Sequence, residues 1–255
     1  MAGAKSKKTI DVSIPIRKET ATIGLLSIML ILLMFNQVTI NNLNTGLTTK
    51  SPGLANLQAT GQATAPASGT LDLASVAERV IPKGVPEIYG PELDVTFDDP
   101  IKSLSIISAL DPTLGANPIE MNEEQKERYI KILTVPTMTC EFCCGAKTAV
   151  FPNGDPACGC EHSYAIRGLT AYLIVNHPDM KDEQIMGEIS RWKVLFFPKQ
   201  MTQRYVQEAQ AGKFTADIAF LMLANGDDPR EIAAEFQTSG ATSTLDGMPD
   251  MVGGC

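Results

Sequence analysis

Five of the six cysteines of this 255-residue chain lie in one short stretch, and a histidine follows the last of them. The residues in this cluster that can bind a metal ion are Cys140, Cys143, Cys144, Cys158, Cys160 and His162. A C-x2-C pair and a C-x-C pair are separated by a turn-rich segment, 151–156, which can fold them back on each other. Two sulfurs from one such loop can reach a single ion, and a second loop can complete its tetrahedral shell. The cluster therefore predicts a metal site.

The second cysteine pair also lies at the expected start of a helix. Cys160 and His162 immediately precede a helical pattern over 163–176. Free backbone N–H groups and the helix dipole at such a position favour a thiolate over a thiol. Because the thiolate is the form that binds metal ions, this position supports the same prediction.

Disulfides and thiol exchange are alternative interpretations of the cluster. Cysteines of exported proteins commonly pair, but five is an odd number, and the adjacent Cys143 and Cys144 cannot easily bond to each other. Cys140 and Cys143 have the spacing of a thiol-redox motif, although the βαβ context of that motif is not visible in the sequence. Covalent haem is disfavoured, because Cys144 occupies the histidine position of C-x-x-C-H.

The donor types suit zinc or copper(I). Four ligands from the cysteines and His162 would suit structural zinc, whereas thiolates together with thioethers would suit copper(I). Met248, Met251 and Cys255 in the C-terminal tail form a possible additional soft-metal group. Cys255 has two other possible roles, which are pairing with the fifth cysteine of the cluster and linking two chains.

The segment Pro156–His162, with the sequence P-A-C-G-C-E-H, resembles exported proteins named for a PCYCGC motif. Those proteins are membrane-attached and have a Cys-Gly-Cys-x-His core. Ala157 stands where that motif has a cysteine. The resemblance covers seven residues and implies extracytoplasmic binding of a soft metal.

An uncharged segment near the N-terminus predicts a membrane anchor. Residues 21–40 contain no charged side chain, and their apolar centre is Ile23–Phe35. Five basic residues precede this segment, so the positive-inside rule places 1–20 in the cytoplasm and the rest of the chain outside the cell membrane. A cleaved signal peptide is the alternative, although no Ala-x-Ala-like cleavage site follows. Both interpretations export the remainder.

The rest of the chain divides by composition into a flexible linker at 41–70, a Pro-rich irregular segment at 71–118, a helical Cys-rich domain at 119–236 and a flexible tail at 237–255. Periodicity and stop signals predict helices near 71–79, 122–133, 163–176, 182–196, 199–211, 216–224 and 228–236. Short strands are expected at Glu92–Phe97 and Leu104–Ala109. The fold class expected is therefore mainly α, with a transmembrane helix, a stalk and a small helical extracytoplasmic domain carrying the metal-binding loop.

The net charge and the absence of several catalytic motifs exclude some classes of function. After residue 40 the chain has 16 basic and 27 acidic residues, which disfavours binding to nucleic acid. No nucleophile elbow, phosphate loop, dinucleotide fingerprint or HExxH helix occurs, so we do not expect an enzyme. The first hypothesis is a membrane-anchored protein that stores, transfers or senses copper or zinc and exchanges the ion with a donor or acceptor protein. The alternatives are an interaction domain stapled by zinc or disulfides, and a thiol-disulfide exchange protein.

Overall fold

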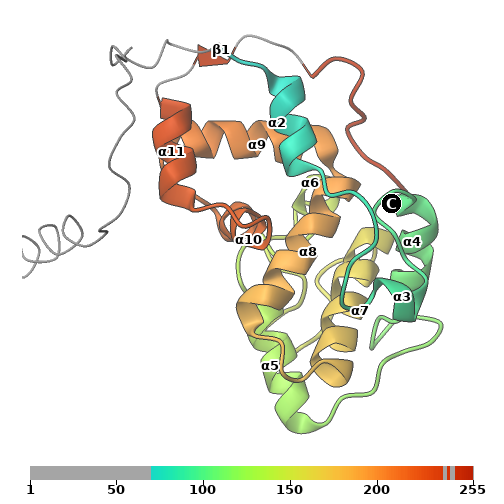
Figure 1. The fold of residues 1–255 in the computed structure, drawn as a ribbon. Helices are drawn as coiled ribbons and strands as arrows, with labels where there is room; N and C mark the ends of the chain where they lie inside the picture. The colour runs from blue at the N-terminus through green and yellow to red at the C-terminus, as the bar shows by residue number, and fades with distance from the viewer. Residues whose placement is uncertain (1–69, 238–239, 242–244, 255) are drawn as a thin grey trace, which may run out of the picture. The chain divides into compact units, whose positions relative to one another are not determined.

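The computed structural model describes residues 70–237, 240–241 and 245–254, which belong to one compact unit (Figure 1). The predicted cytoplasmic tail, the span at 21–40, all but the last residue of the linker, and Cys255 lie outside the described residues. Within the described part of the chain, none of the helices is both long enough and apolar enough to span a membrane.

The described residues are mainly helical, as the sequence predicts. The helices are α2 (Leu73–Val80), α3 (Gly90–Leu93), α4 (Pro100–Ser108), α5 (Glu123–Leu133), α6 (Glu141–Cys144), α7 (Glu161–Asn176), α8 (Asp182–Phe196), α9 (Pro198–Ala211), α10 (Ala216–Ala224) and α11 (Pro229–Gln237). Two short strands, β1 (Thr70–Leu71) and β2 (Gly240–Ala241), pair in parallel.

Local signals set the ends of several helices. The predicted capping box of α5 is present, because the Asn122 side chain accepts the Gln125 N–H and the Gln125 side chain accepts the Asn122 N–H. Pro198 is the first residue of α9, so α8 ends at Phe196 and the chain changes direction there. The helices predicted after residue 120 are thus confirmed to within two residues.

The segment 71–118 differs most from expectation. The strands predicted at Glu92–Phe97 and Leu104–Ala109 are wrong, since α3 covers the start of the first segment and α4 covers most of the second. The Asp99 side chain caps α4 by accepting the Lys102 N–H at 3.1 Å, and Pro100 occupies the first helical position, where its missing N–H has no cost. The pattern Asp-Pro was therefore the decisive local signal.

Helix α4 packs closely on α7 because one glycine makes room for it. A Cβ atom at Gly168 would lie 2.3 Å from the Ile107 carbonyl oxygen, so a larger residue would force the two helices apart. Leu104 and Ile107 are buried on the face of α4 that points inward. Close packing of α4 thus brings it beside the start of α7, where the cysteine cluster lies.

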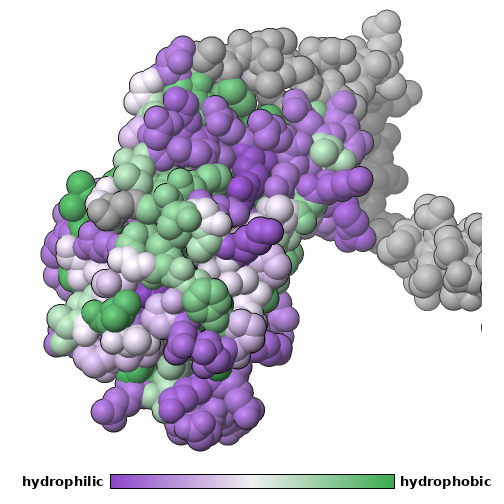
Figure 2. All heavy atoms as spheres, turned by 180° about the vertical axis from the view of Figure 1, so that it is seen from behind, coloured by the Kyte–Doolittle hydropathy of each residue, from purple (hydrophilic) through white to green (hydrophobic). Residues whose placement is uncertain are grey.

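Helix α8 is central to the core and contacts α7, α9 and α10 (Figure 1). Trp192 on α8 is buried, and its indole N–H donates to the Tyr89 hydroxyl at 2.7 Å, which ties the segment before α4 to the helical core. On the surface, apolar side chains gather in the middle of the face that Figure 2 shows, and polar side chains border them. The exposed apolar area of this face is therefore concentrated there.

Candidate metal centre

Backbone hydrogen bonds bring the two cysteine loops together. The Ala149 N–H donates to the Leu133 carbonyl at 3.0 Å, and the Ala157 N–H donates to the Ala149 carbonyl at 3.1 Å. Val150 and Pro156 form an isolated antiparallel bridge, so the chain reverses over the turn between them. The turn-rich segment therefore folds one loop back on the other, as its composition predicts.

Three sulfur atoms form the closest group. The Sγ atoms of Cys140, Cys158 and Cys160 all lie within 4.8 Å of one another, and the Cys140–Cys160 distance is 3.2 Å. Tetrahedral zinc with bonds of about 2.3 Å places its sulfur ligands about 3.8 Å apart. The spacing of these thiols therefore fits a soft ion without large movement of the backbone.

Cys144 lies at the edge of this group. Its Sγ atom is 3.8 Å from the Sγ of Cys140, and its side chain is exposed. It can therefore approach the same ion from the solvent side.

A second group shares Cys160 and adds two residues. Cys143, Cys160 and His162 each offer a ligand atom within 4.8 Å of the others. Cys143 is disulfide-bonded in this structure, whereas Cys140, Cys144, Cys158 and Cys160 are free thiols. A sulfur in a disulfide is not a thiolate, so Cys143 can join an ion only after reduction.

His162 is fully buried within this second group. Its ring packs against Phe196 and Phe197, with centroid distances of 4.9 and 5.0 Å. Its Nε2 atom lies 2.7 Å from the Val252 carbonyl oxygen, and its Nδ1 atom is buried without a hydrogen-bond partner. The imidazole that shares a ligand group with the Cys160 thiol therefore has a buried nitrogen available to bind an ion.

The electrostatics of the cluster favour one thiolate. The hydrogen bond from the Cys140 thiol, with a further hydrogen bond from the Ser163 N–H, lowers the pKa of Cys160 to about 4. The same hydrogen bond to Cys160, together with burial, raises the pKa of Cys140. Burial raises the pKa of Cys158 to about 11. Of these three thiols Cys160 therefore ionises most readily, and a cation that binds to all three must displace thiol protons.

A buried guanidinium holds the second loop. Arg167 and Asp111 are both fully buried and form an ion pair at 2.6 Å. The Nη1 atom of Arg167 also donates to the Cys158 carbonyl at 2.9 Å and to the Ser163 hydroxyl. The position of Cys158 therefore depends on one cationic side chain of α7.

Two cations hold the first loop. The fully buried ammonium of Lys193 lies 2.8 Å from Glu141 and 2.6 Å from Asp217. Arg204 contacts the same two carboxylates. Because Glu141 opens α6, this network fixes the helix turn that carries Cys143 and Cys144.

Strained backbone lies beside that network. Thr137 has a positive φ of 72°, an unusual conformation for a β-branched residue. Its carbonyl accepts a hydrogen bond from Lys193 at 2.7 Å, and its hydroxyl accepts the Asp217 N–H at 3.2 Å. The buried network therefore supports the unfavourable turn that leads into Cys140.

The sequence pattern alone predicts no role for Arg167 or Lys193. A signal was nevertheless present, because both side chains fall on the buried faces of their helices, where a charge requires a partner. Arg167 follows the buried Ile166, and Lys193 lies one turn after the buried Ile189. A charge within an apolar stripe was the feature that could have identified them.

The predicted tail group lies only partly within the structure. Met248 lines an apolar cavity together with Leu195 and Pro198, and Met251 is 40 % exposed. Cys255 lies outside the described residues. A metal-binding role for this tail group stays a prediction.

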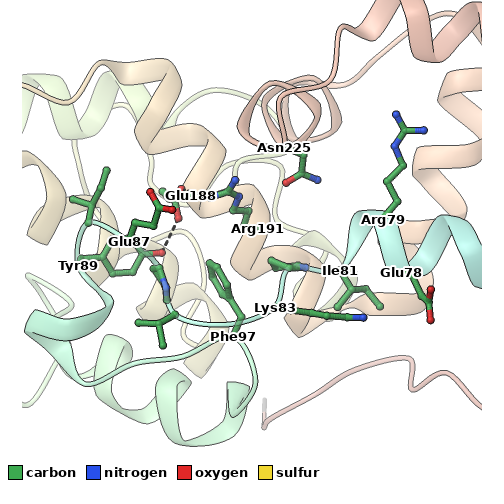
Figure 3. Close-up of a pocket in the computed structure, with 14 residues that line it drawn as sticks. Glu78, Arg79, Ile81, Lys83, Glu87, Tyr89, Phe97, Glu188, Arg191 and Asn225 are labelled. Atoms are coloured by element: carbon green, nitrogen blue, oxygen red, sulfur yellow. Dashed lines mark hydrogen bonds and ion pairs between the residues drawn. The ribbon is translucent and has the colours of Figure 1, made fainter.

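A large cavity lies away from the cysteines. It has a volume of about 590 Å³ and is lined by charged and apolar residues between α2 and α8 (Figure 3). Figure 3 shows the Glu188 carboxylate hydrogen-bonded to the Tyr89 hydroxyl, a contact of 2.9 Å. Glu188 also pairs with Arg191 at 2.8 Å. The Glu188 carboxylate at the cavity wall is therefore already paired with Arg191.

No family model, curated protein or solved structure matches this chain. The assignment of a function therefore rests on the geometry of the cysteine cluster.

Proposed function

We propose that this chain is a membrane-anchored extracytoplasmic protein that binds a soft metal ion, copper(I) or zinc, for storage, transfer or sensing. The observation that carries the proposal is the group of three free thiols, Cys140, Cys158 and Cys160, with sulfur atoms within 4.8 Å of one another. Free thiols at this spacing, one of them with a strongly lowered pKa, are the donors that soft ions select.

The remaining coordination position has two candidates. Cys144 approaches from the exposed side, and His162 approaches from the buried side through the group it shares with Cys160. A fourth ligand from His162 would suit a closed zinc site, whereas three thiolates with an exposed Cys144 would suit exchange of copper(I) with another protein.

The location proposed for this site comes from the sequence. The uncharged segment 21–40, preceded by basic residues, supports a single-pass anchor with the cysteine cluster outside the cytoplasm. The resemblance of Pro156–His162 to PCYCGC-motif proteins supports the same location. Exchange would then occur with a metal-donor or metal-acceptor protein of that compartment.

One observation favours a second candidate function, thiol-disulfide exchange. Cys143 is disulfide-bonded, and its Sγ atom lies within 4.8 Å of the Sγ atom of Cys160, whose pKa is lowered. A thiolate beside a disulfide is the arrangement from which exchange begins. The two functions differ in whether the resting cluster holds a metal ion.

Elemental analysis with thiol counting tests the proposal. The full chain would be purified anaerobically in detergent without added metal. We expect about one copper or zinc per chain, lost in the Cys158→Ser/Cys160→Ser variant and kept in a Ser105→Ala control. Absence of metal from the wild-type chain, with most cluster thiols oxidised, would exclude metal binding and favour disulfides or thiol exchange.

A further inference from the structure

We propose that the C-terminal segment 245–254 completes the metal centre, because the Val252 carbonyl fixes the His162 tautomer that presents Nδ1 as the metal ligand. This inference rests on the proposed function. It assigns a positioning role to a segment that the sequence predicts to be a flexible tail.

The segment is attached to the core at several points. The Val252 N–H donates to the Phe196 carbonyl at 2.9 Å, and Asp250 lies 3.4 Å from the Lys199 ammonium. Leu245 at its start is buried. Figure 1 shows the described C-terminal end beside α4, the helix that packs on α7. The segment therefore lies against the elements that surround His162.

One glycine allows this close approach. Gly253 has a positive φ of 89°, and a Cβ atom there would lie 2.4 Å from Leu104 Cδ2 and 3.2 Å from His162 Nε2. Any larger residue would therefore be strained and would push the chain away from the imidazole. The hydrogen bond between the preceding Val252 carbonyl and His162 therefore depends on glycine at position 253.

The hydrogen bond determines which nitrogen can bind a metal ion. A carbonyl oxygen carries no hydrogen, so at 2.7 Å the His162 Nε2 atom must be the donor. In the neutral ring the lone pair then belongs to Nδ1, which is buried and has no partner. Metal-binding histidines commonly donate their other N–H to a backbone carbonyl, which fixes the ring orientation and increases ligand basicity.

The position of His162 beside Cys160 would allow Nδ1 to bind the same ion as the cysteines. The imidazole shares a ligand group with Cys160, the cysteine common to both groups. Buried polar atoms are rarely left without a partner, so a bound ion would satisfy the one that this arrangement leaves open. The segment 245–254 would thus orient His162 so that it binds an ion already bound by the thiols.

Nitrogen NMR of the imidazole tests this inference directly. The chain has two histidines, so a His177→Gln background leaves one imidazole signal set in the full chain labelled with 15N-histidine. His177 is a suitable residue to remove, because its imidazole contacts the Glu92 carboxylate and its described contacts include no cysteine. We expect the reduced, metal-free protein to show a hydrogen on Nε2, the nitrogen that contacts the Val252 carbonyl oxygen. Added zinc should shift Nδ1.

Two neighbouring glycines provide a variant and its matched control. Gly253→Ala should disrupt the Val252–His162 contact, change the tautomer signal and weaken zinc binding about tenfold or more. Gly254→Ala should behave as the background protein, because its Cβ atom would meet only Glu161 Oε2, at 3.9 Å.

Zinc binding that leaves the imidazole signals unchanged, or coordinates Nε2, would overturn this inference and leave the thiol site intact. The same conclusion would follow if Gly253→Ala changed neither the tautomer nor the affinity. Failure of the reduced wild-type chain to bind either zinc or copper(I) would overturn the proposed function together with this inference.

Discussion

The two cysteine loops are positioned in different ways. The first loop is held through a side chain, since the Glu141 carboxylate pairs with both Lys193 and Arg204. The second is held through its backbone, because Arg167 donates to the Cys158 carbonyl. A carboxylate between cysteines can be replaced by mutation, whereas a carbonyl cannot, so the side-chain support of the second loop is removed by changing Arg167.

The two cysteine loops also differ in the number of cationic side chains that support them. Phe142 in the first loop packs against both Lys193 and Arg204, with distances from its ring centroid of 5.2 and 4.5 Å. Either cation can therefore support this loop when the other is removed. The second loop has one buried cation among its described contacts. The structure therefore indicates that the second loop is the more sensitive of the two.

Substitution Arg167→Met should have the largest effect. It leaves the fully buried Asp111 without its ion-pair partner and should lower the free energy of unfolding by about 3 kcal/mol or more. Urea denaturation would measure this loss. Arg230→Met is the matched control, since Arg230 forms an exposed pair with Asp228, and equal stabilities of the two variants would contradict the account.

Substitution Lys193→Met should have a smaller effect, of about 2 kcal/mol, because Arg204 still contacts Glu141 and Asp217. The Lys193→Met/Arg204→Met double variant should lose more stability than the two single losses added together. Simple additivity in urea denaturation would argue against the redundancy inferred for the first loop.

Substitution Glu141→Gln should affect metal binding more than folding. The weaker pairing with Lys193 and Arg204 would loosen α6 and reduce zinc affinity about tenfold, measured by competition with a chromogenic chelator. Glu123→Gln, in an exposed pair with Lys126, provides the control. Unchanged affinity in Glu141→Gln would mean that the first loop needs no support from this network.

The pKa of Cys160 predicts a pH dependence of stability in the reduced, metal-free chain. Its folded pKa, about 4, lies below the unfolded value near 9, so between these values the unfolded state binds more protons and stability rises with pH. This contribution is complete above about pH 9 and disappears as the pH falls through about 4. Denaturation across this range should give a shallower dependence for Cys160→Ser, and an identical dependence would contradict the assigned thiolate.

Substitution Cys144→Ser should have the smallest effect. Cys144 is exposed, and its described sulfur neighbour is Cys140 at 3.8 Å, so its loss leaves the other three free thiols in place. We expect zinc affinity to change much less than in Cys158→Ser, in the same chelator competition. A larger loss for Cys144→Ser would make the exposed sulfur a principal ligand.

The sequence predicts the features that depend on neighbouring residues. The Asn122–Gln125 capping box, the Pro198 stop and the chain reversal between the cysteine pairs all follow from local chemistry. Helix α4 was missed because its apolar residues were assigned to a strand, although Asp99 and Pro100 mark a helix start.

The side chains that position the cysteine cluster depend on contacts between residues far apart in the sequence, which the spacing of the cysteines does not predict. Arg167 pairs with Asp111, which is 56 residues away, and His162 meets Val252 across 90 residues. The sequence thus identifies the donor atoms of the cluster, whereas their positioning requires the tertiary structure.

X-ray absorption spectroscopy of the metal-loaded full chain would show whether Cys140, Cys158 and Cys160 bind the ion. We expect a first shell dominated by sulfur at about 2.3 Å for zinc, with at least three sulfur atoms in the wild-type chain and fewer in Cys158→Ser/Cys160→Ser. A first shell of oxygen and nitrogen without sulfur, unchanged in that variant, would contradict metal binding by Cys140, Cys158 and Cys160.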